Sequence, residues 1–149
     1  MSDSMIIKEE VLFNANATQV WDLLINPELT KQYMFGCEVL SDWKVGSPVH
    51  WKGKTENGET VVYVKGKVLE YQEGRKVTST TFDPNSGMAD IPINHVNLSY
   101  ELTETEEGTL LTITQGDFAG AVEGEKRYNE SKSGWKEMVI PMMKKLLEE

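Results

Sequence analysis

The residue types that carry out covalent or metal chemistry are few in this chain. His50 and His95 are the only histidines, Cys37 is the only cysteine, and no metal or nucleophile motif surrounds them. A zinc site needs three or four converging ligands, and a nucleophilic cysteine needs a base beside it. We therefore expect no metal, no cofactor and no catalytic residue of this kind, and we interpret Cys37 as a free thiol at a helix-to-strand junction.

Acid–base catalysis would depend on two other positions, because it requires a carboxylate or histidine inside a cavity. Glu9 shares one face of the first expected strand with Ile7 and Val11, so it points towards a cavity if that apolar face is buried. A glutamate that reaches solvent from the strand edge is the alternative. His95 begins a strand after a proline-containing loop. An enzymatic function would rest on Glu9 and His95.

Aromatic, methionine and hydroxyl side chains form a better-defined candidate site. Pockets for small apolar ligands are lined by such side chains, with a few polar groups that orient the ligand. The same residues would also suit a filled core, and the sequence leaves both interpretations open. The expected ligand-binding lining consists of Trp51, Tyr100, Trp135, Met138 and Met142 on inward faces, Tyr33 and Phe35 at one end, Ser79 and Thr81 as polar groups, and Glu9.

The order of the elements determines how these residues are positioned. Residues 5–13 have the composition of a strand. A helix capped by Asn16 or Thr18 follows and ends before Pro27, where a second short helix begins. Short alternating segments then lead to a long amphipathic helix. Because the connections between strands are too short for crossovers, we predict an α+β fold in which a curved antiparallel sheet of about six or seven strands wraps around the closing helix.

Pro141 lies in the middle of that closing helix. Proline lacks the backbone N–H, and its ring clashes with the carbonyl of Glu137, so we expect a kink. Met138, Met142 and Met143 surround the proline, and unbranched methionine side chains adapt to irregular space. These residues suit a deformable cavity wall; a packing adjustment without function is the alternative.

Length and charge narrow the classes of protein. The chain has 149 residues, which suits a single domain over residues 1–149. Its net charge of −9 disfavours nucleic acid and anionic membranes, because binding to phosphate needs clustered Lys and Arg. No apolar run is long enough to span a membrane, and the first residues are not of the signal-peptide type. We expect a cytoplasmic protein that binds neither nucleic acid nor membrane.

Three segments of the chain are informative: ATQVWDLLINPELTKQY, DWKVGSPVHWK and SGWKEMVIPMMKKLLEE. Together with the order of the elements, they resemble the START-like (SRPBCC, helix-grip) superfamily. Within it, the chain is similar to the family related to the activator of the ninety-kilodalton heat-shock-protein ATPase. That family has an acidic–aromatic–x–x–Gly turn and a Gly-Trp pair at the start of its last helix. Its turn usually contains two glycines, whereas Ser47 follows Gly46 here.

The resemblance spans nearly the whole chain and implies a cavity between sheet and helix, but no common reaction, so function has to be argued from the site. Our main expectation is a protein that binds a small hydrophobic ligand without catalysis. A chaperone or stress-related regulator is the first alternative, although the eukaryotic activator pairs this type of domain with another that is absent from this sequence. A cyclase- or hydrolase-like enzyme that uses the same cavity is the second. No oligomeric state is predicted.

Overall fold

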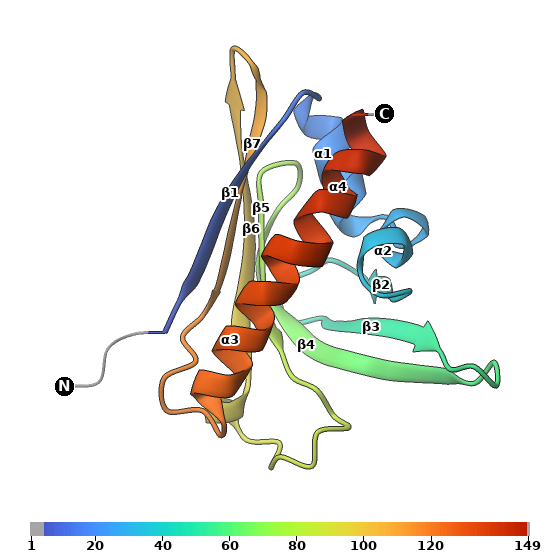
Figure 1. Ribbon diagram of the computed structural model, residues 1–149, viewed down its shortest axis with the longest axis vertical. Helices are drawn as coiled ribbons and strands as arrows, with labels where there is room; N and C mark the ends of the chain where they lie inside the picture. Colours follow the sequence, from blue (N-terminus) through green and yellow to red (C-terminus); the bar gives the residue numbers. More distant parts are fainter. Residues whose placement is uncertain (1–4, 149) are drawn as a thin grey trace.

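A computed structural model describes residues 5–148, and its elements follow the predicted order (Figure 1). The strands are β1 (Ile7–Phe13), β2 (Glu38–Ser41), β3 (Pro48–Lys54), β4 (Thr60–Gln72), β5 (Lys76–Thr81), β6 (Val96–Thr105) and β7 (Gly108–Gly116). The helices are α1 (Ala17–Ile25), α2 (Pro27–Tyr33), α3 (Gly124–Gly134) and α4 (Ile140–Glu148), and a π-helical turn, Trp135–Val139, joins α3 to α4.

The seven strands form one antiparallel sheet in the order β1-β7-β6-β5-β4-β3-β2. Strand β4 has 13 residues; its first part pairs with β3 and its last part with β5. The register shifts between Val68 and Glu70, and an irregularity of this kind bends a strand. Figure 1 shows that β3 and the first part of β4 swing away from β5, β6 and β7. The predicted α+β fold, with a curved antiparallel sheet around a long closing helix, is confirmed.

The starts of the two short helices are determined by capping residues and a proline that can be recognised in the sequence. Asn16 caps α1: its Oδ1 accepts from the backbone N–H of Gln19 at 2.8 Å, and the Gln19 side chain accepts from the N–H of Asn16 at 3.1 Å. Pro27 is the first residue of α2, and Asn26 caps that helix by accepting from the N–H of Glu28 at 3.0 Å. Proline at the first position of a helix loses no intrahelical hydrogen bond, and the predicted start of a second short helix at Pro27 is confirmed.

The closing helix crosses the concave face of the sheet as one continuous rod (Figure 1). It begins at Gly124, so the expectation that Gly134-Trp135 opens this helix is wrong. Residues of α3 are mostly polar, and Gly124 is the one residue of α3 that is buried, whereas the turn and α4 bury Trp135, Val139 and Met143. Of the helices in residues 5–148, none is both long enough and apolar enough to cross a membrane.

The π-helical turn explains which side chains of the closing helix are buried. The N–H of Ile140 donates to the carbonyl oxygen of Trp135, five residues back, whereas an α-helical bond spans four residues. Pro141, which follows directly, has no N–H to donate to Glu137. The irregularity predicted at Pro141 therefore takes the form of a wide turn within an otherwise continuous helix.

The prediction that Met138 and Met142 face the sheet is wrong. Their exposed fractions are 56% and 38%, whereas Met143 is 0% exposed. The wide turn holds one more residue than an α-helical turn, so residues four positions apart stay on the same face and residues three apart do not. Met143 therefore lies in the core, in line with Trp135 and Val139, and the two predicted methionines face outwards.

Candidate functional site

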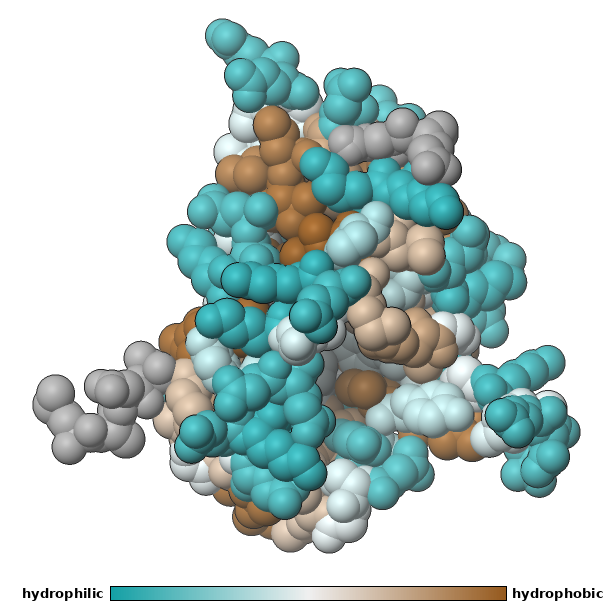
Figure 2. Space-filling view, viewed as in Figure 1, coloured by the Kyte–Doolittle hydropathy of each residue, from teal (hydrophilic) through white to brown (hydrophobic). Residues whose placement is uncertain are grey.

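A cavity of about 630 Å³ lies between the concave face of the sheet, the closing helix and the end of α2. Figure 2 shows the hollow beside the closing helix, with hydrophobic side chains at its floor. Its apolar lining consists of Met34, Phe35, Cys37, Trp51, Tyr63, Val64, Phe82, Val96, Leu98, Phe118, Trp135 and Val139. Its polar lining consists of Thr81, Asp83, Gln115, Arg127, Glu130 and Ser131, and Gly134 adds backbone.

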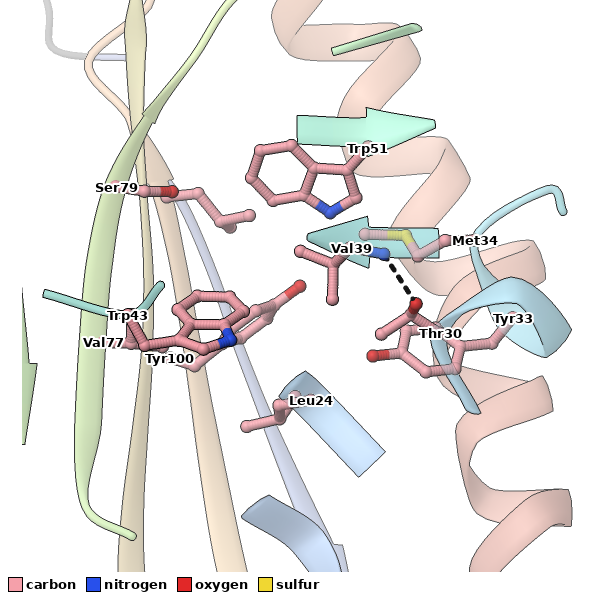
Figure 3. Close-up of a pocket in the computed structure, with 11 residues that line it drawn as sticks. Leu24, Thr30, Tyr33, Met34, Val39, Trp43, Trp51, Val77, Ser79 and Tyr100 are labelled. Carbon is pink, nitrogen blue, oxygen red and sulfur yellow. Dashed lines mark hydrogen bonds between the residues drawn. The ribbon is translucent and has the colours of Figure 1, made fainter. Parts of the chain in front are cut away.

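A second cavity of about 20 Å³ lies on the side of α1 and α2 (Figure 3). Its size suits about one water molecule. Met34, Trp51 and Leu98 line both cavities, so these side chains separate the large cavity from the small one. Beside the small cavity, the N–H of Val39 donates to Thr30 Oγ1 at 3.0 Å and ties β2 to α2. This side of the interior is therefore almost filled.

The structure brings seven of the ten predicted lining residues to one of these two cavities. Trp51, Phe35, Thr81 and Trp135 line the large cavity, and Tyr33, Ser79 and Tyr100 line the small one. Met138, Met142 and Glu9 line neither. Whether any of the seven binds a ligand stays a prediction.

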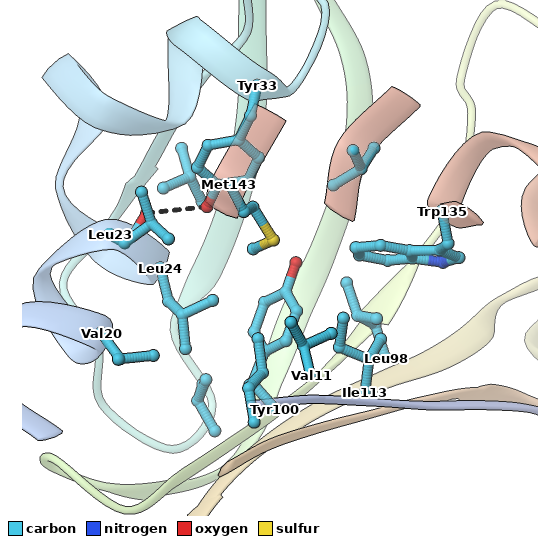
Figure 4. Close-up of a cluster of buried hydrophobic side chains, with 14 of the residues drawn as sticks. Val11, Val20, Leu23, Leu24, Tyr33, Leu98, Tyr100, Ile113, Trp135 and Met143 are labelled. Carbon is cyan, nitrogen blue, oxygen red and sulfur yellow. Dashed lines mark hydrogen bonds between the residues drawn. The ribbon is translucent and has the colours of Figure 1, made fainter. Parts of the chain in front are cut away.

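Trp135 is fixed at the centre of the large cavity's wall. Its indole Nε1 donates to Gln115 Oε1 at 2.9 Å, and its ring meets the Tyr100 ring edge-on, with 6.1 Å between centroids. Figure 4 shows the Trp135 ring above Leu98 and Ile113 of the sheet. Burial raises the pKa of Tyr100 far above its ordinary value, so this phenol stays neutral.

Asn94 and Arg127 hold the end of the large cavity near the loops. Asn94 is fully buried; its Nδ2 donates to Ala89 O at 2.9 Å, and its Oδ1 accepts from the N–H of Val122 at 3.0 Å. The Nη2 of Arg127 donates to Asn94 O at 3.0 Å, and its guanidinium lies 5.9 Å from the centroid of Phe118. Burial lowers the pKa of Arg127. Within residues 5–148, no group accepts from the buried Nη1 of Arg127.

Phe35 stands at the mouth of the large cavity. It is 66% exposed, and its φ of 55° lies in the left-handed region that few residues other than glycine adopt. The backbone here closes α2: Gly36 N–H donates to Lys31 O at 3.1 Å, and Cys37 N–H donates to Met34 O at 2.9 Å. Such a conformation costs about 1–3 kcal/mol.

The two acid–base candidates lie outside the lining of both cavities. Glu9 is on the buried face of β1, with its Oε1 3.7 Å from Lys136 Nζ. His95 stacks on Phe82 at 4.6 Å between centroids, and its Nε2 lies 2.5 Å from Asp90 Oδ1. The other oxygen of Asp90 pairs with Lys65, and this bond, with that to His95, lowers the pKa of Asp90. Neither candidate is placed to act on a molecule in the cavity.

The remaining chemical candidates do not converge. His50 lies on β3 and His95 at the start of β6. In the described part of the chain, no three or more His, Cys, Asp or Glu side chains are grouped so that they could hold a metal ion. Cys37 is buried and free, and burial raises the pKa of its thiol, which disfavours the reactive thiolate.

The sequence interpretation missed Gln115, Asn94 and Arg127. Gln115 had a usable signal: it alternates with Leu111 and Ile113 along β7, so a polar amide occupies an inward position of an apolar face. Asn94 and Arg127 had none, because their contacts join segments that are far apart in sequence.

Comparisons with known proteins agree with this geometry. A solved structure of ChR145 from Cytophaga hutchinsonii is 33% identical, with a TM-score of 0.76 over 98% of this chain and 96% of that chain. MLL2253 from Mesorhizobium loti is 18% identical, with a TM-score of 0.74 over 96% of each chain. CalU16 from Micromonospora echinospora is 19% identical, with a TM-score of 0.68 over 95% of this chain and 74% of that chain. No curated protein matches the chain.

The family comparison covers almost the same residues as the fold. Residues 14–148 match the family model described as "Activator of Hsp90 ATPase homolog 1-like protein". That segment runs from the end of β1 through the closing helix and includes all the lining of both cavities. The chain therefore belongs to the Activator of Hsp90 ATPase homolog 1-like family, within the START-like (SRPBCC) superfamily.

Proposed function

We propose that this protein binds one small, largely apolar molecule in the large cavity, without covalent chemistry. The observation that carries the proposal is the volume of about 630 Å³ between sheet and helix, which lies within the range of about 300–1,000 Å³ usual for ligand pockets. Membership of a START-like family supports the same position for a ligand.

The lining provides the interactions that such a ligand would need. Most of the lining residues are apolar, and burial of each methylene group of a ligand against them contributes about 0.8 kcal/mol before the costs of binding. The polar groups are few and come from separate elements, as in sites where they orient a ligand rather than react with it. Glu9 and His95, the acid–base candidates, lie outside the lining. These features support binding rather than catalysis.

A pair of serine variants tests the proposal. Ser131 lines the large cavity, whereas Ser133 is exposed on the same helix. A phenylalanine at residue 131 would fill part of the cavity, so Ser131→Phe should weaken binding of a fluorescent naphthalene probe at least about ten-fold. Ser133→Phe adds the same ring outside the cavity and should leave the affinity unchanged. Absence of probe binding to the unmodified protein, or equal weakening by both variants, would contradict the proposal.

Native mass spectrometry of the freshly purified protein provides an independent measurement. A co-purified compound with a mass of a few hundred daltons that is released on denaturation supports the proposal. The Ser131→Phe variant should carry less of this compound than Ser133→Phe, because the two proteins differ only in where the ring is placed.

A further inference from the structure

Gln115 is the polar side chain whose orientation in the cavity is most firmly determined. An indole Nε1–H can only donate a hydrogen bond. Because Trp135 Nε1 lies 2.9 Å from the Gln115 side chain, the oxygen of the amide has to face the indole. The amide nitrogen, with its two N–H donors, therefore points the other way. Among the described residues nothing accepts from this nitrogen, and Gln115 lines the large cavity.

The neighbours of Gln115 are apolar, so they offer no hydrogen-bond acceptor to its amide N–H groups. Gln115 lies in β7 opposite Ile7 of β1 and Leu98 of β6, and both neighbours are buried. A polar group in such surroundings is costly unless it is hydrogen-bonded. A ligand that buries this wall has to supply an acceptor for the amide, or it leaves the amide unsatisfied.

A second unpaired donor lies on the closing helix. Arg127, Ser131 and Trp135 are spaced by four residues and share the face that lines the cavity. Eight residues of helix extend about 12 Å, so Arg127 lies near one end of the cavity and Trp135 near its centre. The buried Nη1 of Arg127 has no partner within residues 5–148. This atom is itself shielded, so Gln115 provides the donor that a ligand in the cavity would meet.

Acidic side chains at the rim restrict the charge of the ligand. Asp83 and Glu130 line the same cavity and are exposed, and the chain has a net charge of −9. This arrangement disfavours an anion on its way into the cavity. An acceptor without charge satisfies the donors and avoids this repulsion.

We propose that the ligand is a neutral apolar ring compound with a carbonyl oxygen, and that Gln115 recognises this oxygen through its amide N–H. The proposal rests on the function proposed above and adds the chemical class of the ligand. The rings would pack between Trp51 and Trp135, and the carbonyl oxygen would accept from Gln115 Nε2.

Two probes of nearly identical shape, 9-fluorenone and fluorene, test this proposal. They have the same fused rings, and only fluorenone has a carbonyl oxygen. Calorimetric titration of the unmodified protein should show a two- to ten-fold preference for fluorenone, the usual effect of one net hydrogen bond. Because both compounds bury the same rings, the contribution of apolar burial cancels in the ratio of their affinities. Equal affinities would overturn the proposal.

Variants of Gln115 assign the preference to this side chain. Gln115→Glu at pH 8 still accepts from Trp135 but presents a second acceptor, so the preference should disappear or invert. Gln115→Met removes the donors at similar length, so the two affinities should become equal. Gln72→Glu, which makes the same charge change at an exposed glutamine outside the large cavity, should keep the wild-type preference. A preference that survives in both Gln115 variants would overturn the proposal.

The infrared carbonyl band of bound fluorenone gives a readout on the unmodified protein, in case the variants fold poorly. Hydrogen bonding to Gln115 should lower the frequency of this band relative to fluorenone in an apolar solvent, and an unshifted band would overturn the proposal. Failure of the proposed function appears differently, as the absence of binding of fluorenone, fluorene and the naphthalene probe alike. Binding of both ring compounds without preference leaves that function standing and refutes only the carbonyl recognition.

Discussion

The two ends of the interior differ although they share one sheet and one helix. At one end, α1 and α2 pack against α4, and Tyr33 Oη donates to Leu23 O at 2.7 Å beside fully buried Met143 (Figure 4). At the other end, α3 is polar, and the connections over residues 82–95 and 117–123 take the place of additional helices. The filled end leaves about 20 Å³, and the open end leaves about 630 Å³. The cavity therefore results from the absence of covering helices over one part of a curved sheet.

The largest expected effect is a loss of stability when a side chain of the filled end is shortened, compared with a side chain on the solvent-facing side of the same helix. Met143→Ala should lower the free energy of unfolding by about 2–5 kcal/mol, because it leaves a void in a packed core. Met138→Ala should change it by less than about 0.5 kcal/mol, since Met138 is exposed. Urea denaturation measures both values. Equal losses would show that the helix faces are assigned incorrectly.

The open end depends on buried hydrogen bonds, so its stability should respond to Asn94. Asn94→Ala leaves Ala89 O and the N–H of Val122 without their partners and should cost about 1–3 kcal/mol. Asn97→Ala, at an exposed asparagine nearby in sequence, is the control and should be close to neutral. Hydrogen exchange should show faster opening of residues 83–94 in the Asn94 variant alone. Unchanged exchange would contradict a role for Asn94 in holding this end.

Gly134 tests whether the helix wall faces empty space. Nothing lies within 4 Å of the position that a Cβ at Gly134 would take, and this residue lines the large cavity. Gly134→Ala should therefore raise the free energy of unfolding by about 0.5–1 kcal/mol, through helix propensity alone. Thermal unfolding measures the change. A destabilised variant would indicate that the wall is already covered.

The smallest effect concerns a surface cluster at the open end. Lys65 and His95 lower the pKa of Asp90 below its ordinary value of 3.8. A carboxyl with a lowered pKa in the folded state adds stability above that ordinary value and loses it as the pH falls through the lowered pKa. The stability difference between the wild type and Asp90→Asn should thus be smaller at pH 2 than at pH 5. A difference that persists at pH 2 would contradict this assignment.

The elements could be predicted from the sequence because their signals are local. Asn16 and Pro27 mark helix starts through contacts with residues a few positions away, and alternation along β6 and β7 assigns their buried faces. The burial of Met143 in place of Met142 could not be predicted from helical spacing, because an ideal spacing of 3.6 residues does not apply across a π-helical turn.

The division of the interior into a large and a small cavity could not be predicted from the sequence either. Thr81 and Tyr100 both lie at inward positions of their strands, yet Thr81 borders the large cavity and Tyr100 the small one. What separates them is the position of α1 and α2 over the curved sheet, which depends on contacts distant in sequence. A lining and a filled core therefore have the same signature in the sequence, and only the arrangement in space distinguishes them.

The four tryptophans of the chain provide the most direct test of binding at the open end, because each indole N–H gives its own NMR signal. Trp51 and Trp135 line the large cavity, whereas Trp21 and Trp43 belong to the filled end, where both contact Tyr71. Titration with fluorenone should shift the signals of Trp51 and Trp135 in a saturable manner and leave those of Trp21 and Trp43 in place. Four unmoved signals, or larger shifts at Trp21 and Trp43, would contradict a ligand site between the sheet and the closing helix.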